Sequence, residues 1–211
     1  MAKRQIFLAK NNKPFYSEYF VDFTWNSGFA KSQKQKNIKA IHEIYQKSHP
    51  NIKLLEISSA SLNFEGIELS AFNLPIIIGN NKMTVECAFQ GSKVFSNGGP
   101  YIDLYRKSSK EAKKDLRLKT SGDIIGFELY GIDYPNNPKT AFYDWIYFNA
   151  CKQSKKAISS LIKYNGFTDI AFNPEKSLNC QARSAAIIVG LFNAGLFDKI
   201  NSFDDFVSIV Y

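Results

Sequence analysis

The sequence predicts an α+β fold that is mainly helical and has short strands, and three observations support this class. The chain has 211 residues, of which 45% are hydrophobic and 15% aromatic, so it can bury a large core and is not a disordered chain. Its apolar segments mix helical i, i+3, i+4 spacing with short extended runs. These extended runs are too short and too irregularly spaced for a Rossmann fold or a barrel.

The first part of the chain is expected to alternate strands with one amphipathic helix. The expected elements are a strand over 16–23, a helix over 31–48, a strand within 51–59 and an extended segment over 68–78. The helix follows from apolar residues at helical spacing, namely Ile38, Ile41, Ile44 and Tyr45. Pro75 restricts the last segment to an edge or an irregular strand, because proline cannot donate to a β-ladder.

The second part of the chain is expected to be richer in helix. Thr84 can cap a helix that runs through Phe95 and is stopped by Gly98-Gly99-Pro100. The further expected elements are a helical region from 100 to 119, strand and turn over 121–135, an aromatic helix over 139–153, a helix from 156 to about 165 followed by an irregular loop, and a buried helix over 178–195.

Domain organisation and compartment follow from what the sequence lacks. No linker divides it, so we expect one globular unit, with residues 1–63 as an N-terminal extension packed on a domain of residues 64–211. The apolar part of the N-terminus, Ile6–Ala9, is too short for a signal peptide, which predicts a cytoplasmic protein without membrane contact. Three scattered cysteines and two histidines predict neither disulfides nor a metal site.

A formal net charge of +8 favours a polyanionic partner such as nucleic acid. The excess is concentrated in two segments, 31–39, which holds four lysines and no acid, and 106–119, which holds seven basic residues against two acidic ones. Such side chains can contact phosphates without reading base sequence. The candidate DNA contacts are Lys34, Lys36, Arg106, Lys110, Lys113 and Lys114.

The segment 85–93 is the most informative one for chemistry. On a continuous helix Glu86, Gln90 and Lys93 would lie at i, i+4 and i+7, in a single polar stripe flanked by small and apolar residues. One interpretation is a partly exposed Glu–Lys pair, which is the usual fate of charges at helical spacing. The other is a stripe that faces a ligand cavity, because an unpaired buried carboxylate is costly.

Three further polar positions each have a structural and a functional interpretation. Trp145, in an aromatic helix, either belongs to the core or stacks on a base. Asp169, in an apolar loop, either accepts backbone N–H groups or takes part in catalysis. The group Asn179, Gln181 and Arg183 opens an apolar helix, where it either caps the helix or binds a diphosphate.

Three short motifs, taken in order, resemble the NADAR family, whose members have the YbiA-like fold. They are Ser70-Ala71-Phe72-Asn73, Glu86 to Lys93, and Lys110 to Lys114, within a match over roughly 64–195. Cys87 stands where the family usually has histidine. Several segments are more closely similar to NADAR proteins encoded beside DarT-type toxins, namely QKQKNI, LEISS, FQGSKVF, GGPY, AFYDW and FTDIAFNPEKS.

The resemblance implies an antitoxin that removes ADP-ribose from guanine in DNA by hydrolysing an N-glycosidic bond. Its catalytic residues would be Glu86, Lys93, Trp145 and Asp169. Its substrate contacts would be Phe72, Asn73, Phe89, Gln90, Asn179, Gln181 and Arg183. No cofactor is implied, ADP-ribose being the product, and the implied partners are ADP-ribosylated, single-stranded DNA and a DarT-type toxin.

Three other functions are compatible with the same residues. One is that of a phage or bacterial structural protein, for which only the aromatic core argues. Some NADAR enzymes resemble N-glycosidases of small riboflavin-pathway intermediates, and a non-catalytic module that binds DNA or ADP-ribose needs only the aromatic and basic residues. The concentration of lysine and arginine in the segments 31–39 and 106–119 favours a polymeric anion over a small substrate.

Overall fold

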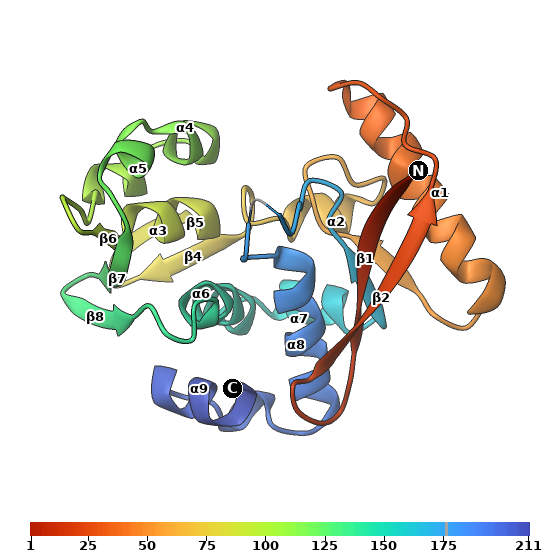
Figure 1. The fold of residues 1–211 in the computed structure, drawn as a ribbon. Helices are drawn as coiled ribbons and strands as arrows, with labels where there is room; N and C mark the ends of the chain where they lie inside the picture. Colours follow the sequence, from red (N-terminus) through yellow and green to blue (C-terminus); the bar gives the residue numbers. More distant parts are fainter. Residues whose placement is uncertain (176) are drawn as a thin grey trace. The chain divides into compact units, whose positions relative to one another are not determined.

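The computed structural model describes residues 1–175 and 177–211 and confirms the α+β class. The chain forms two compact units (Figure 1). The first combines residues 1–70 with 155–211, and the second comprises residues 71–154. Lys176, which lies in the motif FTDIAFNPEKS, is outside the described residues.

The first unit contains a four-stranded sheet in the order β2-β1-β9-β3. Its strands are β1 (Ala2–Ala9), β2 (Tyr16–Phe23), β3 (Leu54–Glu56) and β9 (Gly166–Thr168). The pair β1–β2 forms the long antiparallel hairpin visible in Figure 1, β9 is antiparallel to β1, and β3 is parallel to β9. The strands expected over 16–23 and within 51–59 are confirmed, and β1 is an additional strand inside the predicted N-terminal extension 1–63.

Helix α1 (Lys31–Ser48) has the predicted bounds and packs an apolar stripe on the sheet. Ile38, Ile41 and Tyr45 are buried in one cluster with Ile6 and other sheet residues. The prediction for Ile44 was wrong, since its side chain is 41% exposed. At 100° per residue Ile44 lies at the margin of the stripe, where the sheet no longer covers it.

The prediction of an irregular loop after residue 165 was also wrong, because Gly166–Thr168 forms the buried strand β9. Only three residues long, β9 lies between β1 and β3, and its pattern is too short to show a period. A side chain at Gly166 would collide with Leu54 and Leu8, at 2.6 and 2.9 Å from an added Cβ. The glycine therefore marks close packing as well as a turn.

The first unit contains five further helical elements among its described residues. They are α2 (Phe64–Glu68), α7 (Lys155–Leu161), α8 (Gln181–Asn193), the 3₁₀ turn η2 (Phe197–Lys199) and α9 (Phe203–Val210). The buried helix α8 packs against β1 and β9, which confirms the expectation for 178–195. Ser202 and Asp205 cap α9 reciprocally, and this satisfies N–H groups at its first turn.

The second unit contains two small antiparallel sheets and several short helices. One sheet pairs β4 (Pro75–Ile78) with β5 (Asn81–Thr84), and the other has the order β6-β7-β8, with β6 (Lys93–Phe95), β7 (Ile124–Leu129) and β8 (Ile132–Pro135). The helical elements are α3 (Val85–Gly91), η1 (Ile102–Arg106), α4 (Ser109–Lys114), α5 (Arg117–Thr120) and α6 (Ala141–Lys152). Pro75 begins an edge strand, as its chemistry requires.

The extent of α3 corrects one sequence prediction. Thr84 is the N-cap, as predicted, and its side chain accepts from the Cys87 N–H at 3.3 Å. The helix ends at Gly91, however, and not at Phe95, so Lys93 lies in strand β6. Gly91 packs directly on Tyr105, 2.4 Å from an added Cβ, and residues 93–95 are taken up in pairing with β7.

The core of the second unit is built from aromatic rings contributed by α3, α6 and β7. Phe142 of α6 stacks on Phe127 at 4.3 Å between ring centroids, and Phe89 of α3 contacts Tyr143 edge-on at 5.0 Å. Such pairs add specific geometry to the burial of apolar area. The aromatic helix thus fixes the orientation of α3, which carries Glu86.

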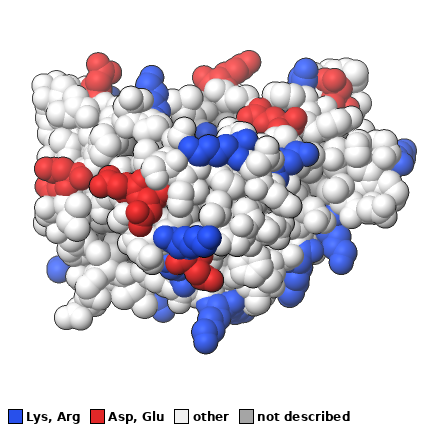
Figure 2. Space-filling view, turned by 90° about the horizontal axis from the view of Figure 1, so that it is seen from below, with Lys and Arg blue, Asp and Glu red and all other residues white. Residues whose placement is uncertain are grey.

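The surface charge is mixed on the face drawn in Figure 2, where basic and acidic side chains alternate with wide uncharged areas. The net charge of +8 is therefore not spread as a uniformly basic surface over this face. Among the helices of residues 1–175 and 177–211, none has the length and apolar character that crossing a bilayer requires.

Candidate active site around Glu86

Glu86 is a buried carboxylate in the first turn of α3, with only 4% of its surface exposed. Its Oε1 accepts a hydrogen bond from Gln90 Nε2 at 2.9 Å, one helical turn further on. The interpretation as a surface Glu–Lys pair is therefore wrong. A buried negative charge costs several kcal/mol unless compensated, so the environment of Glu86 has to supply positive charge and donors.

Two lysines supply that positive charge, and each also lies over an aromatic ring. Lys113 Nζ, from α4, is 3.9 Å from Glu86 Oε1 and 5.1 Å from the centre of the Phe72 ring. Lys93 Nζ lies 4.6 Å from the centre of the Phe89 ring. Burial lowers the pKa of Lys93 to about 8, against the opposing attraction of Glu86. Lys113, predicted as a DNA contact, is thus a neighbour of the candidate catalytic carboxylate.

Gln90 has one atom that the protein leaves unused. Its Nε2 donates to Glu86, while its buried Oε1 has no hydrogen-bond partner among the described residues. Reversing the amide would point the oxygen at the carboxylate, so the donor orientation is fixed by charge. Because buried polar atoms are nearly always paired, this oxygen is suited to accept from a hydroxyl or amine of a ligand.

A chain of hydroxyl groups holds the three sequence motifs together. Ser109 Oγ donates to the Phe72 carbonyl at 2.8 Å and lies 2.7 Å from Thr84 Oγ1, the cap of α3. The Glu86 N–H also donates to the carbonyl of Ala71 at 2.9 Å. Phe72 and its exposed neighbour Asn73 are thereby fixed next to the start of α3.

Trp145 lies on α6 in the same unit as Glu86 and is partly buried. Its ring is nearly parallel to that of Phe148, with centroids 5.9 Å apart, and its side chain is hydrogen-bonded to that of Tyr134. These contacts fix the indole in one orientation. Its predicted stacking on a base stays a prediction.

In the first unit, Asp169 follows strand β9 and is held by two donors. Asp169 Oδ1 accepts from the Ala171 N–H at 3.0 Å, and Oδ2 accepts from Gln181 Nε2 at 2.9 Å. The structure thus brings together two predicted site residues that are twelve positions apart. Gln181 begins α8, so this helix positions the carboxylate.

Asn179 and Arg183 lie near the same helix start, but neither side chain caps it. The N-cap is Cys180, whose side chain makes no cap hydrogen bond. Asn179 Oδ1 is buried without a hydrogen-bond partner among the described residues, and the Arg183 guanidinium lies 5.9 Å from the centre of the Tyr16 ring. The interpretation of this cluster as a helix cap is therefore not supported.

Glu56, which sequence reasoning missed, is a second buried carboxylate in the first unit. Its Oε2 accepts from Thr168 Oγ1 at 2.6 Å and its Oε1 from the Ile170 N–H at 2.9 Å. Glu56 therefore binds the residues that precede and follow Asp169. His42 Nε2 lies 2.8 Å from the same Thr168 hydroxyl. An acid inside the apolar strand LLE, and a histidine one turn after Ile38, were the signals available in the sequence.

Burial shifts the pKa values of Glu56 and His42, which both contact the Thr168 hydroxyl, in opposite directions. Burial, and secondarily the charge of Asp169, raises the pKa of Glu56 to about 7, against hydrogen bonds from Ile170, Thr168 and Ser58. Burial lowers the pKa of His42 to about 4. Near neutral pH the histidine is therefore uncharged, and Thr168 donates to Glu56 while it accepts from the ring.

These shifts predict how stability depends on pH. Folded Glu56 keeps its proton up to about pH 7, so its contribution is lost as pH rises from 4.5 to 7, by at most about 1.4 kcal/mol per pH unit. His42 acts oppositely, its contribution being lost as pH falls from 6.5 to about 4. In the wild type the two contributions to the free energy of unfolding offset each other. In Glu56→Gln only the contribution of His42 should remain, so the free energy of unfolding should increase as pH rises.

Urea unfolding at several pH values between 4.5 and 7 measures this difference. The free energy of unfolding of Glu56→Gln should increase with pH more steeply than that of the wild type. Glu43→Gln, at an exposed position of α1, is the matched control and should run parallel to the wild type. Parallel curves for all three proteins would contradict the assignment.

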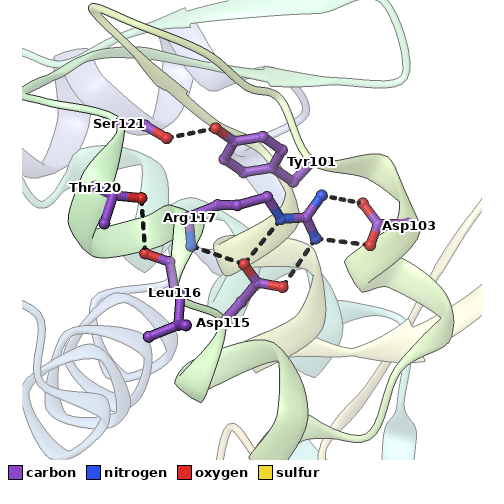
Figure 3. A network of polar contacts seen from close by, with 7 residues as sticks. All are labelled: Tyr101, Asp103, Asp115, Leu116, Arg117, Thr120 and Ser121. Carbon is purple, nitrogen blue, oxygen red and sulfur yellow. Dashed lines mark hydrogen bonds and ion pairs between the residues drawn. The ribbon is translucent and has the colours of Figure 1, made fainter.

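The predicted DNA contacts are distributed over both units. Lys36 is exposed on α1 and Lys34 is partly buried there, whereas Arg106, Lys110, Lys113 and Lys114 are exposed in the second unit. Arg117, from the same basic segment, is engaged internally (Figure 3). Its guanidinium binds Asp103 at 2.7 and 3.1 Å and Asp115 at 2.8 and 2.9 Å. That arginine is occupied by protein carboxylates and not by phosphate.

The described residues contain no group of three or more His, Cys, Asp or Glu side chains arranged to hold a metal ion. The three cysteines are free and buried. Burial raises the pKa of Cys151 and Cys180 above its usual range, so neither thiol is predisposed to act as a nucleophile.

The α+β fold, with the motifs at 70–73, 86–93 and 110–114 gathered around one buried glutamate, places the chain among the NADAR proteins. A family model described as DarT1-associated NADAR antitoxin matches residues 2–211. The chain therefore belongs to the family of DarT1-associated NADAR antitoxins. The match extends well beyond residues 64–195 and includes residues 2–63. No protein with a curated description matches the sequence significantly.

Proposed function

We propose that this protein is an ADP-ribosyl glycohydrolase that removes ADP-ribose from guanine in DNA and so reverses the modification made by a DarT-type toxin. The family supports the antitoxin role. The observation that carries the enzymatic proposal is the burial of Glu86 between an amide donor and two lysines. A charge compensated at this cost is typical of a functional carboxylate.

Hydrolysis of an N-glycosidic bond passes through a transition state with positive charge on the sugar ring. In the proposed reaction Glu86 takes a proton from water, or faces the anomeric carbon as a stabilising charge. The water oxygen bonds to that carbon while the bond to the guanine nitrogen breaks, and guanine leaves with a proton. The Gln90 amide donates to the carboxylate, and the positive charges of Lys93 and Lys113 stabilise it for this role.

The neighbours of Glu86 are suited to bind the ribose. The unused Oε1 of Gln90 can accept a hydrogen bond from a sugar hydroxyl, and the Phe72 and Phe89 rings beside the lysines offer apolar faces. Asp169 is proposed as the second carboxylate, which orients the sugar or protonates the leaving base. Arg183 and Asn179 are proposed for the ADP portion, and Trp145 for stacking on guanine or adenine.

The test uses the wild-type protein and single-stranded DNA that carries ADP-ribose on guanine. We expect release of free ADP-ribose and restoration of unmodified guanine, followed by chromatography and mass measurement of the DNA. Riboflavin-pathway intermediates are assayed alongside, and turnover of these alone would contradict the DNA substrate. Tight binding of the modified DNA without turnover would instead indicate a non-catalytic module.

A further inference from the structure

The second unit has an open cavity of about 780 Å³ that the proposed catalytic residues do not line. It is bordered by β5, η1 and the turn between β7 and β8, and this volume is within the range of ligand sites. Its wall combines two tyrosine rings with three basic side chains. The basic residues are Lys82, Arg106 and Lys107.

The rings of Tyr105 and Tyr130 stack on each other, and one of them is buried while the other is exposed. Tyr105 is buried, and its hydroxyl lies 3.0 Å from Ser92 Oγ and donates to the Glu128 carbonyl at 3.3 Å. Tyr130 stacks on it, with centroids 5.4 Å apart and planes at 24°, and remains 43% exposed. An exposed ring on a rigid base is suited to stack on a nucleobase.

The backbone of Tyr130 is unusual for a tyrosine. Tyr130 and Gly131 connect β7 to β8 as a two-residue turn, with φ of 53° and 80°. Turns of this type favour asparagine or glycine at both positions, and a bulky residue at positive φ is strained. The turn therefore carries an aromatic ring at a conformational cost, which suggests a binding role for the ring.

The charge of the cavity favours an anion. Lys82, Arg106 and Lys107 are exposed and form no ion pair within the described part of the chain. The two acids of the wall are engaged, Asp103 by the Arg117 guanidinium (Figure 3) and Glu128 by the Gly131 N–H at 3.2 Å. The three basic side chains of the wall therefore outnumber Glu128, the one acid of the wall that forms no ion pair within the described residues.

The cavity is joined to the element that carries Glu86. The Cys87 thiol donates to the Lys107 carbonyl at 3.2 Å, and η1 packs along α3. Lys107 lies at the cavity, whereas Lys113, six residues later, lies beside the Glu86 carboxylate. The segment that connects the cavity to the candidate active site therefore has a basic side chain at each end.

We propose that this cavity binds nucleotides that flank the modified guanine in single-stranded DNA, with Tyr130 stacking on a base and Lys82, Arg106 and Lys107 contacting phosphates. The proposal rests on the proposed function, because it assumes that the substrate is a DNA strand. Contacts of this kind give an enzyme a preference for a polymer over a free nucleotide.

The first test measures binding of an unmodified single-stranded oligodeoxynucleotide of about 12 nucleotides by fluorescence anisotropy. Tyr130→Asn removes the ring with a residue that tolerates positive φ, and we expect about 5-fold to 100-fold weaker binding. Phe29→Asn removes a fully exposed ring of the first unit and is the matched control. Equal affinities of these two variants would overturn the proposal.

A second pair of variants tests the phosphate contacts. Arg106→Gln should weaken binding and lower the salt slope by about 0.7, the value for one contact to a single strand. Lys155→Gln makes the same charge change at an exposed position of the first unit and should keep the wild-type slope. If both variants keep the wild-type slope, Arg106 makes no phosphate contact and the proposal fails.

Kinetics separate this proposal from the proposed function. The ratio of kcat/KM for an ADP-ribosylated oligonucleotide to that for the ADP-ribosylated mononucleotide should fall in Tyr130→Asn. If the wild type releases ADP-ribose from neither substrate, the proposed function fails, and the binding experiments still decide on the cavity. Unaltered DNA binding together with weakened binding of a DarT-type toxin would overturn the DNA assignment and indicate a protein partner.

Discussion

Replacing Glu86 by glutamine should reduce release of ADP-ribose from modified single-stranded DNA by about 10²-fold to 10⁴-fold. The carboxamide is nearly isosteric and can still accept from Gln90 Nε2 through its oxygen. It carries no charge and takes no proton from water, so it cannot stabilise the positive sugar or activate the nucleophile. Turnover should fall while the affinity for modified DNA is largely kept.

The matched control for this variant is Glu43→Gln. Glu43 is an exposed glutamate 3.7 Å from Lys39 on α1, which is the surface arrangement that Glu86 does not have. We expect wild-type turnover for this control and an unchanged melting temperature for both variants within a few degrees. Undiminished turnover by a folded Glu86→Gln protein would show that the carboxylate is not the catalytic group.

The second large effect should come from Lys93→Met, which keeps most of the length of the side chain and removes its charge. We expect a loss of roughly 10²-fold in kcat/KM, comparable to the loss of one preorganised charged donor. The pKa of Lys93 is lowered to about 8, so the lysine is positively charged below that pH and neutral above it. The wild-type activity should therefore fall as pH rises through about 8.

The pH profile distinguishes two roles for Lys93. If its ammonium stabilises Glu86 and the substrate, the alkaline loss of activity disappears in Lys93→Met, and the variant has low, pH-independent activity in this range. If the neutral amine were instead the base, wild-type activity would rise through pH 8. Measuring kcat/KM from pH 6 to about 10 on the same DNA substrate decides between them.

Several long elements were predictable because each contains enough residues to show its period, although the eight-residue strand β1 was missed. The helix over 31–48 and the strand over 16–23 have the predicted bounds, and the aromatic helix differs at its ends only. Among the short elements, β3 was predicted but β9 was not. Strand β9 has three residues, and its existence depends on β1 and β3, which are distant in sequence.

The candidate site shows the same limit at the level of single residues. The pairing of Glu86 with Gln90 follows from helical spacing and is confirmed, but the position of Lys93 does not follow from it. The helix ends at Gly91 because residues 93–95 pair with β7, and position 91 is a glycine because Tyr105, fourteen residues later, occupies the space of a side chain. Lys113 comes close to Glu86 through packing of α4 on α3, which no local pattern encodes.

Glu56 illustrates why some buried carboxylates cannot be found by pattern alone. An acid in a short strand is ordinarily read as the exposed side of an alternating pattern. Here all three residues of β3 are buried, and the carboxylate is satisfied by Thr168 and Ile170, more than a hundred residues away. Only the folded chain shows that its partners exist.

The hydrogen bonds of Ser109 determine where this sequence can tolerate substitutions and changes of length during evolution. Its small hydroxyl is the junction at which Phe72 and Thr84 meet, although 37 and 25 residues separate them from it along the chain. The turns between the strands and helices of these connections can lengthen or shorten without moving the glutamate, because the junction and not the spacing along the chain sets the geometry. Drift should therefore accumulate in those connections, while a larger or non-hydroxylic residue at the junction would disturb three distant segments at once.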